Sequence, residues 1–456
     1  MDQMAPPHEP AALSGTVRSG AVLSGVLRTV DLRGVTGKLK KLLPAPEIVD
    51  DEDAAQVVRA ILADVKARGD MAVLDATERF DRVRPDSLRV DPAEVKVALG
   101  EISPSLRDAL EAAADNIGDY HRSQLHDDSA YERDGVKVTE LRMPVDRAGL
   151  YVPGGLAPLA STVLMTAIPA RVAGVAELAM CSPPGPDGKI AASVLAAAAV
   201  AGVDEVYQVG GAQAIGALAY GTESVPAVDV IVGPGNRYVA IAERMVAGQG
   251  AVGVPSAFTG PSEVAVVADD TTDPSFAAVD LVVQAEHGPD GLSYLITWSE
   301  DAAKRIAGEV ARITAQSPRR QAIEATFERG GFCVLVDGPD QAMQAANVIA
   351  AEHLELMCAD AAALVGKVTS AGAVFVGPWA PASVGDYAAG PNHVLPTARS
   401  ARFSNALRVD DFCKQIHVVE VSRAGLDRLA APVEALALSE GLAAHALSVT
   451  MRTSVS

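Results

Sequence analysis

Two short polar stretches lie at the ends of apolar, helix-forming runs. Polar side chains are unfavourable in a packed apolar core, so both stretches indicate a function. The first is Gln284-Ala-Glu-His287-Gly288, and the second is Glu352-His353. Gln284 and His287 are three residues apart, so they share a face if the run from Phe276 is helical. Neutral oxygen and nitrogen donors on one face are suitable ligands for zinc. The pair therefore indicates part of a metal site, which needs further ligands.

Glu352-His353 follows a second apolar run and joins a carboxylate to an imidazole. One group can activate water and the other can accept a proton near neutral pH, which suits an oxidation that requires both. An isolated Glu-His dipeptide is, however, more often a pair exposed to solvent.

Two more acid–histidine combinations occur later in the chain. Asp386 and His393 lie in residues 377–408, which are rich in Pro, Gly, Asn and Ser and typical of a functional loop. Asp386 could complete a metal site, although a lone turn aspartate more commonly bonds its own backbone. His393 could touch a substrate or brace the loop. Glu440 and His445 stand beside a helical pattern, and they could reach a site only if the tail folds back.

Three glycine-rich turns follow strand-like runs, and each supplies a polar side chain. These side chains are Tyr151, Gln213 and Asn236. Backbone N–H groups at such turns attract anions, so a dinucleotide could lie across them. The usual GxGxxG spacing is absent. Taken alone, turns of this kind are more often simple tight turns.

Length and charge restrict the class of function. The chain has 456 residues, of which 49% are hydrophobic, so it is globular with room for two or three domains. A formal net charge of −20 argues against a nucleic-acid partner, because phosphate binding needs a basic face. The longest apolar run, residues 190–203, is too short to span a bilayer. Four widely spaced cysteines favour the reduced thiols of a cytoplasmic protein.

Hydrophobic periodicity predicts a parallel α/β fold. Helical spacing from Asp53 to Gly69 opens a helical N-terminal portion that reaches about Tyr120. Strand-like runs then alternate with helical runs in two series, at 148–152, 177–181, 205–209 and 229–232, and at 263–269, 294–298, 332–336 and 373–376. The expected fold class is therefore α/β, with two Rossmann-like parallel units in series and a small helical C-terminal tail domain that contains residues 433–452.

In their joint order, these stretches resemble the histidinol dehydrogenase family over nearly the whole chain. No single motif would suffice, but the order of all of them outweighs the simpler interpretations given above. The segments that carry the resemblance are Gly149-Leu-Tyr-Val-Pro-Gly-Gly155, Gly211-Ala-Gln-Ala-Ile215, Gly233-Pro-Gly-Asn236, Gly260-Pro-Ser-Glu263, Gln284-Ala-Glu-His287, Glu352-His-Leu-Glu355, Gly385-Asp-Tyr387 and Asn392-His-Val-Leu-Pro396.

The resemblance implies a zinc-dependent enzyme that oxidises L-histidinol to L-histidine, through bound L-histidinaldehyde, with two NAD in succession. His353 would accept the alcohol proton, and Glu352 with His353 would then activate water. The implied zinc ligands, which would orient the substrate, are Gln284, His287, Asp386 and His445. Substrate contacts would be these ligands and the catalytic pair, together with Ser262 and Glu440. The implied NAD contacts are Tyr151, Gln213 and Asn236.

The resemblance also implies a homodimer in which the C-terminal tail of each chain reaches the partner's site. We therefore expect Glu440 and His445 to act in the partner subunit. The expected division of the chain has five parts. Residues 1–26 form a loose extension and 27–44 an N-terminal arm. Residues 45–150 with 262–405 form the α/β domain that carries the metal and catalytic residues, 151–261 the NAD-binding domain, and 406–456 the tail.

Three other functions stay open on the sequence alone. A paralogous zinc alcohol dehydrogenase would act on a different alcohol, and the spacing of Glu440 and His445 counts against it. A zinc hydrolase would use Glu352 without a nicotinamide, and the three glycine-rich turns count against it. A non-catalytic metal- or ligand-binding protein is disfavoured by the intact Glu352-His353 pair.

Overall fold

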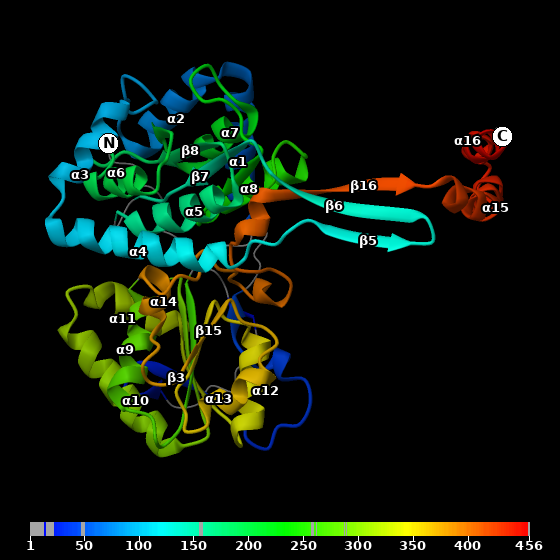
Figure 1. Cartoon of the computed structure of the whole chain (residues 1–456). Coiled ribbons are helices and arrows are strands. Elements are labelled where there is room, and N and C mark those ends of the chain that lie inside the picture. Colours follow the sequence, from blue (N-terminus) through cyan, green and yellow to red (C-terminus); the bar gives the residue numbers. More distant parts are fainter. Residues whose placement is uncertain are drawn as a thin grey trace.

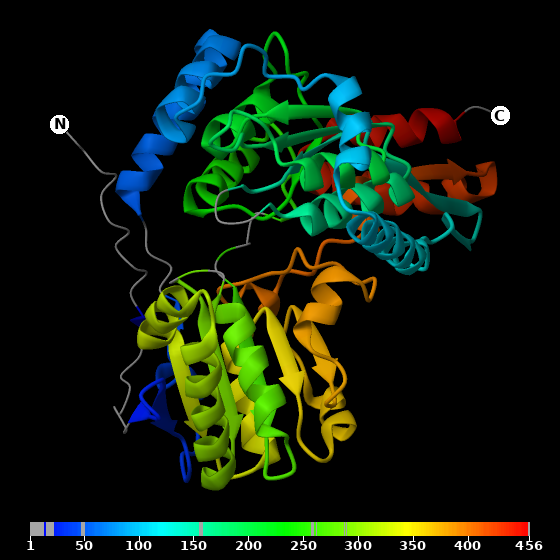
Figure 2. The same cartoon turned by 90° about the vertical axis from the view of Figure 1, so that its left-hand side faces the viewer.

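The computed structural model describes residues 13–14, 22–46, 51–154, 158–256, 260, 262–286, 288 and 290–454. The expected ligand His287 lies outside these residues, as does most of the expected extension over 1–26. Two α/β units lie one above the other, and an arm leaves the upper one (Figures 1 and 2). Across the described ranges, no helix has both the length and the apolar character that crossing a membrane requires.

The upper unit is built on a four-stranded parallel sheet with the order β10-β7-β8-β9. Its strands are β7 (Arg147–Tyr151), β8 (Glu177–Ser182), β9 (Glu205–Gln208) and β10 (Val230–Val232). Helices cover both faces, and their apolar side chains form two cores. The helices are α1 (Glu52–Arg68), α2 (Asp70–Asp81), α3 (Pro92–Glu101), α4 (Pro104–Arg122), α5 (Ala160–Ala173), α6 (Ala192–Val200), α7 (Gly211–Tyr220) and α8 (Arg237–Gly248).

The first four helices belong to this upper unit. The predicted helix from Asp53 to Gly69 is confirmed as α1, which Asp51 caps by accepting a hydrogen bond from the Ala54 N–H. Its buried apolar face packs against α7 and α8, while α3 packs on α6 and α4 on α5. The expected grouping of residues 45–150 with 262–405 is therefore wrong for these helices. The reason is that their apolar faces are covered by helices of the first sheet.

The lower unit is a seven-stranded sheet with the order β15-β14-β11-β12-β13-β3-β2, parallel except where β2 pairs with β3. Its strands are β2 (Val22–Leu23), β3 (Leu27–Asp31), β11 (Glu263–Ala268), β12 (Leu292–Thr297), β13 (Gly331–Leu335), β14 (His353–Leu356) and β15 (Ala373–Val376). All residues of β11 are buried, as expected for a parallel sheet covered on both faces. The α/β class with parallel sheets is confirmed.

Helices lie on both sides of this lower sheet (Figure 1). One face carries α9 (Pro274–Ala285), α10 (Glu300–Gln316) and α11 (Arg320–Gly330), and the other carries η1 (Leu39–Lys41) and α12 (Pro339–Ile349). The remaining short elements are β1 (Leu13–Ser14), β4 (Ala45–Pro46), α13 (Ala361–Leu364), η2 (Val365–Lys367), α14 (Ala382–Tyr387), η3 (Ser400–Arg402) and η4 (Val409–Phe412).

An antiparallel arm projects from the body and ends in two helices (Figure 1). Its strands are β5 (Ser129–Arg133), β6 (Val136–Pro144) and β16 (Cys413–Val421), and its helices are α15 (Arg423–Ser439) and α16 (Ala443–Thr453). The predicted helical tail over 433–452 is confirmed. Strand β16, which runs along β6 for its whole length, was not predicted.

Candidate active site

The candidate catalytic residues gather at the amino edge of the lower sheet. His353 is the first residue of β14 and Glu263 the first of β11, and these strands are neighbours. Gln284 occupies the last turn of α9. Because α9 connects two parallel strands, it runs antiparallel to them, and its last turn returns to their amino ends. The site therefore lies opposite the carboxyl edge, where ligands of open parallel sheets usually bind.

The His353 side chain is the centre of the site. Its Nδ1 lies 3.3 Å from the amide nitrogen of Gln284 and 3.3 Å from the carbonyl oxygen of Glu263. Its Nε2 lies 3.0 Å from Oδ1 of Asp386, to which an Nε2–H donates. The ring stacks on Phe375 with 5.8 Å between centroids. Contacts from four further elements, α9, β11, α14 and β15, therefore fix the position of a side chain that is 3% exposed.

Glu352 lies beside His353 as the sequence predicts, but it is buried rather than exposed. Its Oε2 accepts a hydrogen bond from the Glu263 backbone N–H at 3.0 Å and lies 3.6 Å from Nδ1 of His353. A Cβ at Gly372 would stand 2.5 Å from the Glu352 carbonyl oxygen, so only glycine fits there. Both the side chain and the backbone of Glu352 are thus closely confined.

Buried carboxylates dominate the electrostatics of the site. Burial acts to lower the pKa of His353, but Glu352 and Asp386 outweigh it and hold that pKa well above its ordinary value. Burial, together with the Glu352 carboxylate, raises the pKa of Glu263 to about 8. Glu263 is therefore protonated at neutral pH.

Asp386 lies in the last turn of the short helix α14, so the prediction of a loop at this position is wrong. A Cβ at Gly385 would stand 2.6 Å from the Phe375 ring, so the absence of a side chain lets α14 pack closely on β15. His393 follows, with Nδ1 2.8 Å from the Asp386 carbonyl oxygen and Nε2 3.2 Å from Oγ1 of Thr162 on α5. Burial lowers the pKa of His393. The contacts of His393 brace α14 against the upper unit.

Ser262 precedes Glu263 at the amino edge of β11 and is partly exposed. Its carbonyl oxygen accepts a hydrogen bond from the Leu292 N–H at 3.1 Å, which joins the starts of β11 and β12. The structure therefore places this expected substrate contact next to the residue whose N–H holds Glu352.

The three expected NAD contacts lie at the carboxyl edge of the upper sheet. Tyr151 ends β7, and its hydroxyl oxygen accepts a hydrogen bond from the Gly211 N–H at 3.1 Å. Gln213, two residues further on, is 1% exposed, and its amide nitrogen meets no acceptor in the described part of the chain. Asn236 is exposed, and its side chain caps α8 by accepting from the N–H groups of Tyr238 and Val239. The Tyr151 hydroxyl thus lies against the turn that begins α7, the helix that carries Gln213.

The two expected tail residues lie far from this site in the same chain. Glu440 is the residue that ends α15, and His445 lies in α16, at the far end of the arm (Figure 1). Both are exposed. One chain therefore does not bring Glu440 or His445 to the other site residues.

The donors that one chain does bring together suit an N- and O-ligated metal. Gln284 and Asp386 come from α9 and α14 and meet at the same imidazole. Within the described residues, no group of three or more His, Cys, Asp or Glu side chains forms a metal cluster. Gln284 is an amide and so is not one of these four residue types, and His287 lies outside the described residues. The two donors are therefore part of a ligand set that needs other contributors.

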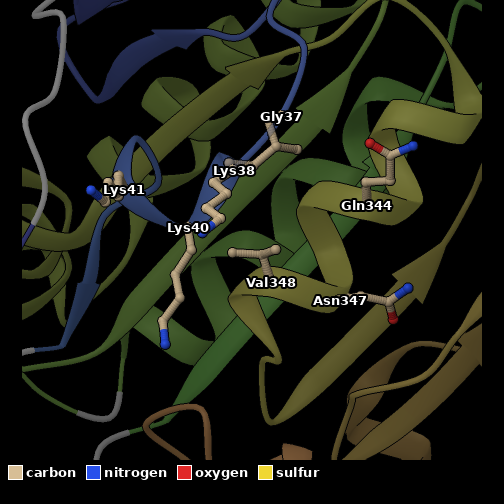
Figure 3. A pocket seen from close by; sticks show the side chains of 8 residues that line it. Gly37, Lys38, Lys40, Lys41, Gln344, Asn347 and Val348 are labelled. Carbon is tan, nitrogen blue, oxygen red and sulfur yellow. The ribbon is translucent and has the colours of Figure 1, made fainter.

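A separate groove of about 660 Å³ lies between η1 and α12, on the opposite face of the lower sheet from α9 (Figure 3). Its polar lining consists of Lys38, Lys40, Lys41, Gln344 and Asn347. The Asn347 side chain binds the end of η2 and the segment that follows, through the Lys367 carbonyl and the Thr369 N–H. The groove contains no candidate catalytic residue, so its size does not mark the site.

Sequence reasoning missed several residues that hold the site together. Glu263 binds Glu352 through its N–H, Phe375 stacks on His353, and Thr162 contacts His393 from the other unit. Only Glu263 had a signal, because it ends one of the glycine-containing motifs. Phe375 and Thr162 lie in ordinary apolar runs, so their roles appear only when the elements pack.

A buried acid–base pair beside nitrogen and oxygen donors, set between two parallel α/β units, defines a two-unit α/β enzyme. A sequence model of the histidinol dehydrogenase family matches residues 46–453. Histidinol dehydrogenase of Parasynechococcus marenigrum is 46% identical over 93% of this chain and 97% of its own, and that of Dechloromonas aromatica is 48% identical over 90% and 95%. The crystal structure of histidinol dehydrogenase from Elizabethkingia anophelis superposes with a TM-score of 0.88 at 34% identity, covering 94% of this chain and 98% of that one.

The chain therefore belongs to the histidinol dehydrogenase family, and it is an oxidoreductase. The resemblance inferred from the motifs is confirmed.

Proposed function

We propose that this protein oxidises L-histidinol to L-histidine through bound L-histidinaldehyde, with zinc and two NAD in succession, as the final steps of histidine biosynthesis. The observation that supports the proposal most is the meeting of Gln284 and Asp386 at His353, with Glu352 beside the ring. This arrangement combines a proton acceptor, a possible water activator and metal donors within one buried cluster. The names of the relatives supply the substrate.

Gln284 and Asp386 would hold zinc from the body of one chain, together with His287, which is two positions beyond the last residue of α9. His445 would complete the set from the partner subunit's tail. When bound, zinc would supply a positive charge that fixes the nitrogen atoms of the substrate. The hydrogen bond between Asp386 and His353 would keep that carboxylate oriented.

The residues of the site can carry both proton transfers. In the first oxidation, His353 would accept the alcohol proton while the carbon-bound hydrogen leaves as hydride to NAD. This step needs the neutral imidazole, and zinc held by Asp386 would favour it, because the metal charge offsets the carboxylates that raise the pKa of His353. The carboxylates of Glu352 and Asp386 stabilise the imidazolium that forms. In the second, Glu352 and His353 take a proton from water as it adds to the aldehyde. The resulting hydrate then gives its hydride to the second NAD.

Residues 151–261 would bind NAD at the carboxyl edge of the upper sheet, through Tyr151, Gln213 and Asn236. The close turn at Gly233 supports this placement, because its φ is 133° and a Cβ there would stand 2.0 Å from the Tyr151 carbonyl oxygen. A glycine lets the backbone lie tightly at the end of the strand, where a cofactor can approach it. Ser262 and Glu440 would contact the substrate.

The functional protein would be a cytoplasmic homodimer in which residues 406–456 reach the partner's site. The shape of the arm supports this, since it holds Glu440 and His445 away from their own body (Figure 1). The two terminal helices and the turn between them also leave large apolar side chains exposed, which a second copy would cover. These side chains are Val433, Leu436, Leu438, Leu442, Leu447 and Met451.

The decisive experiment counts NADH. Zinc-loaded protein receives a limiting amount of L-histidinol with excess NAD, and the reaction runs to completion. About two NADH per histidinol would establish both oxidations, because each hydride transfer reduces one NAD. A yield of about one would place the end of the reaction at the aldehyde, and no NADH would reject histidinol as the substrate.

A further inference from the structure

A second layer of contacts lies directly beneath the candidate site, on the same elements. Glu355 comes two residues after His353 on β14, so the two side chains are on the same face of the sheet. Asp280 comes four residues before Gln284 on α9, so these two share a helical face. The pairing of His353 with Gln284 is thus repeated one step below by Glu355 and Asp280.

The third element repeats in the same way. Ala382 comes four residues before Asp386 on α14, and its backbone N–H donates to Oε1 of Glu355 at 3.1 Å. The Asp280 carboxyl also lies within hydrogen-bonding reach of Glu355. Helices α9 and α14 are therefore each tied to β14 at two levels, and Glu355 makes both of the lower ties.

The lower pair is held by a proton. Glu355 is 0% exposed, and its Oε2 meets no donor among the described residues. Two buried carboxylates do not face each other in the charged state, because repulsion adds to the loss of hydration. Burial and the Asp280 carboxylate raise the pKa of Glu355, and burial raises the pKa of Asp280. One proton between the two groups supplies the missing donor.

We propose that the hydrogen-bonded Asp280–Glu355 pair is a positioning device for the site above it. By fixing α9 and α14 at set places beside β14, the pair determines how Gln284 and Asp386 approach a metal ion. This inference rests on the proposed function, in which those two residues are zinc ligands. Hydrogen-bonded groups behind metal ligands typically contribute roughly 10- to 100-fold to metal affinity.

The test measures the zinc affinity of the metal-free full-length protein by competition with a chromogenic chelator. The double variant D280L/E355L removes both hydrogen-bonding groups without leaving one charge buried alone. Its affinity should fall roughly 10- to 100-fold, with the midpoint of thermal unfolding largely kept. In the presence of saturating zinc, its kcat for histidinol should recover, since the pair acts on the ligands and not on the reacting atoms.

Two matched variants separate positioning from general stability. In Glu355→Gln, the side-chain oxygen still accepts from Ala382 and the amide donates to Asp280, so zinc affinity should stay within about twofold of the wild type. Thr314→Val removes another buried group, a hydroxyl in α10 without a partner among the described residues, and should leave zinc affinity unchanged.

The outcomes are distinct. Zinc affinity of D280L/E355L within about twofold of the wild type, with the wild type binding zinc, overturns the positioning role and leaves the proposed function standing. A wild-type protein that binds no zinc overturns both. If the double variant does not fold, Asp280→Ala replaces it, because Glu355 then still holds α14 while α9 is detached. An affinity loss of about tenfold supports the inference, and no loss overturns it.

Discussion

The two places that carry the proposed site residues differ in how complete they are within one chain. In the lower unit, Gln284 and Asp386 both contact His353, and the side chains of Gln284 and His353 are shielded from water. At the end of the arm, Glu440 and His445 are exposed on helices that do not pack against the body. The first region can be organised before a substrate or a second chain arrives. The second can reach another site only by association.

The two regions therefore depend on different steps of assembly, folding in one case and dimerisation in the other. The buried cluster is stabilised by folding, so its geometry is preorganised and its acid–base groups need no reorganisation. The arm delays part of the assembly until dimerisation, and activity then depends on the concentration of protomers. Variants in the body should therefore change the chemistry at any concentration, whereas variants in the arm should be rescued by an intact partner.

The largest expected effect is that of His353→Asn. Loss of the proton acceptor should lower kcat for histidinol by about 10²- to 10⁴-fold, while asparagine retains polar contacts in the buried position. Initial rates of NADH formation at saturating zinc and NAD measure it. His126→Asn, an exposed histidine after α4, is the control and should keep full activity. A loss below about fivefold would remove His353 from the mechanism.

The second prediction tests whether the arm acts in the partner's site, by complementation between two inactive variants. His353→Asn and His445→Asn are each expected to be nearly inactive, so the two proteins are mixed, dissociated and allowed to reassociate. If the tail acts in the partner's site, each mixed dimer contains one site with both histidines intact. Random pairing then restores about a quarter of wild-type activity. If the tail acts within its own chain, every site keeps one defect and no activity returns.

The sequence was most informative where one element decides the outcome. The spacing of Val58, Leu62 and Val65 before Gly69 predicts α1, because helical periodicity is local. The parallel strands were predictable for the same reason. Strand β14 was missed, since its four residues include His353 and Glu355 and give little of the apolar signal of a buried strand.

Contacts between elements that are distant in the sequence could not be predicted from the spacing of residues along the chain. Gln284, His353 and Asp386 are separated by long stretches of chain, and only the resemblance to a family placed them together. Nothing in α1 to α4 shows which sheet covers their apolar faces, and the expected division of the chain failed there. His287 and its place beside Gln284 stay a prediction.

A third prediction concerns the edge where NAD is proposed to bind. In Gly233→Ala, the new Cβ would meet the Tyr151 carbonyl oxygen, and the φ of 133° would become strained. The resulting displacement of Tyr151 should raise the KM for NAD roughly tenfold with a smaller change in the KM for histidinol. Gly248→Ala has open space around it and serves as the control. Equal changes in both KM values would argue against a local effect on cofactor binding.

The smallest expected effect is on stability. It concerns Glu243, a buried carboxyl group that, within the part of the chain that the structure describes, lacks the partners most buried polar groups have. Glu243 on α8 is 0% exposed, and neither carboxylate oxygen has a partner among the described residues. Burial raises its pKa well above the ordinary value, so folding takes up a proton at neutral pH, and stability falls as pH rises above the unfolded value. Glu243→Gln should therefore add about 1–2 kcal/mol at pH 8 and less at pH 5, since the amide has no charge to lose.

Thermal unfolding of the two proteins at both pH values measures this difference, with the exposed Glu111→Gln as the control. A gain at pH 5 as large as that at pH 8 would mean that the effect arises from packing and not from the proton. A loss at pH 8 would show that the charged Glu243 has a partner in solution. In that case the body, like the arm, would contain a group that is completed from outside the chain.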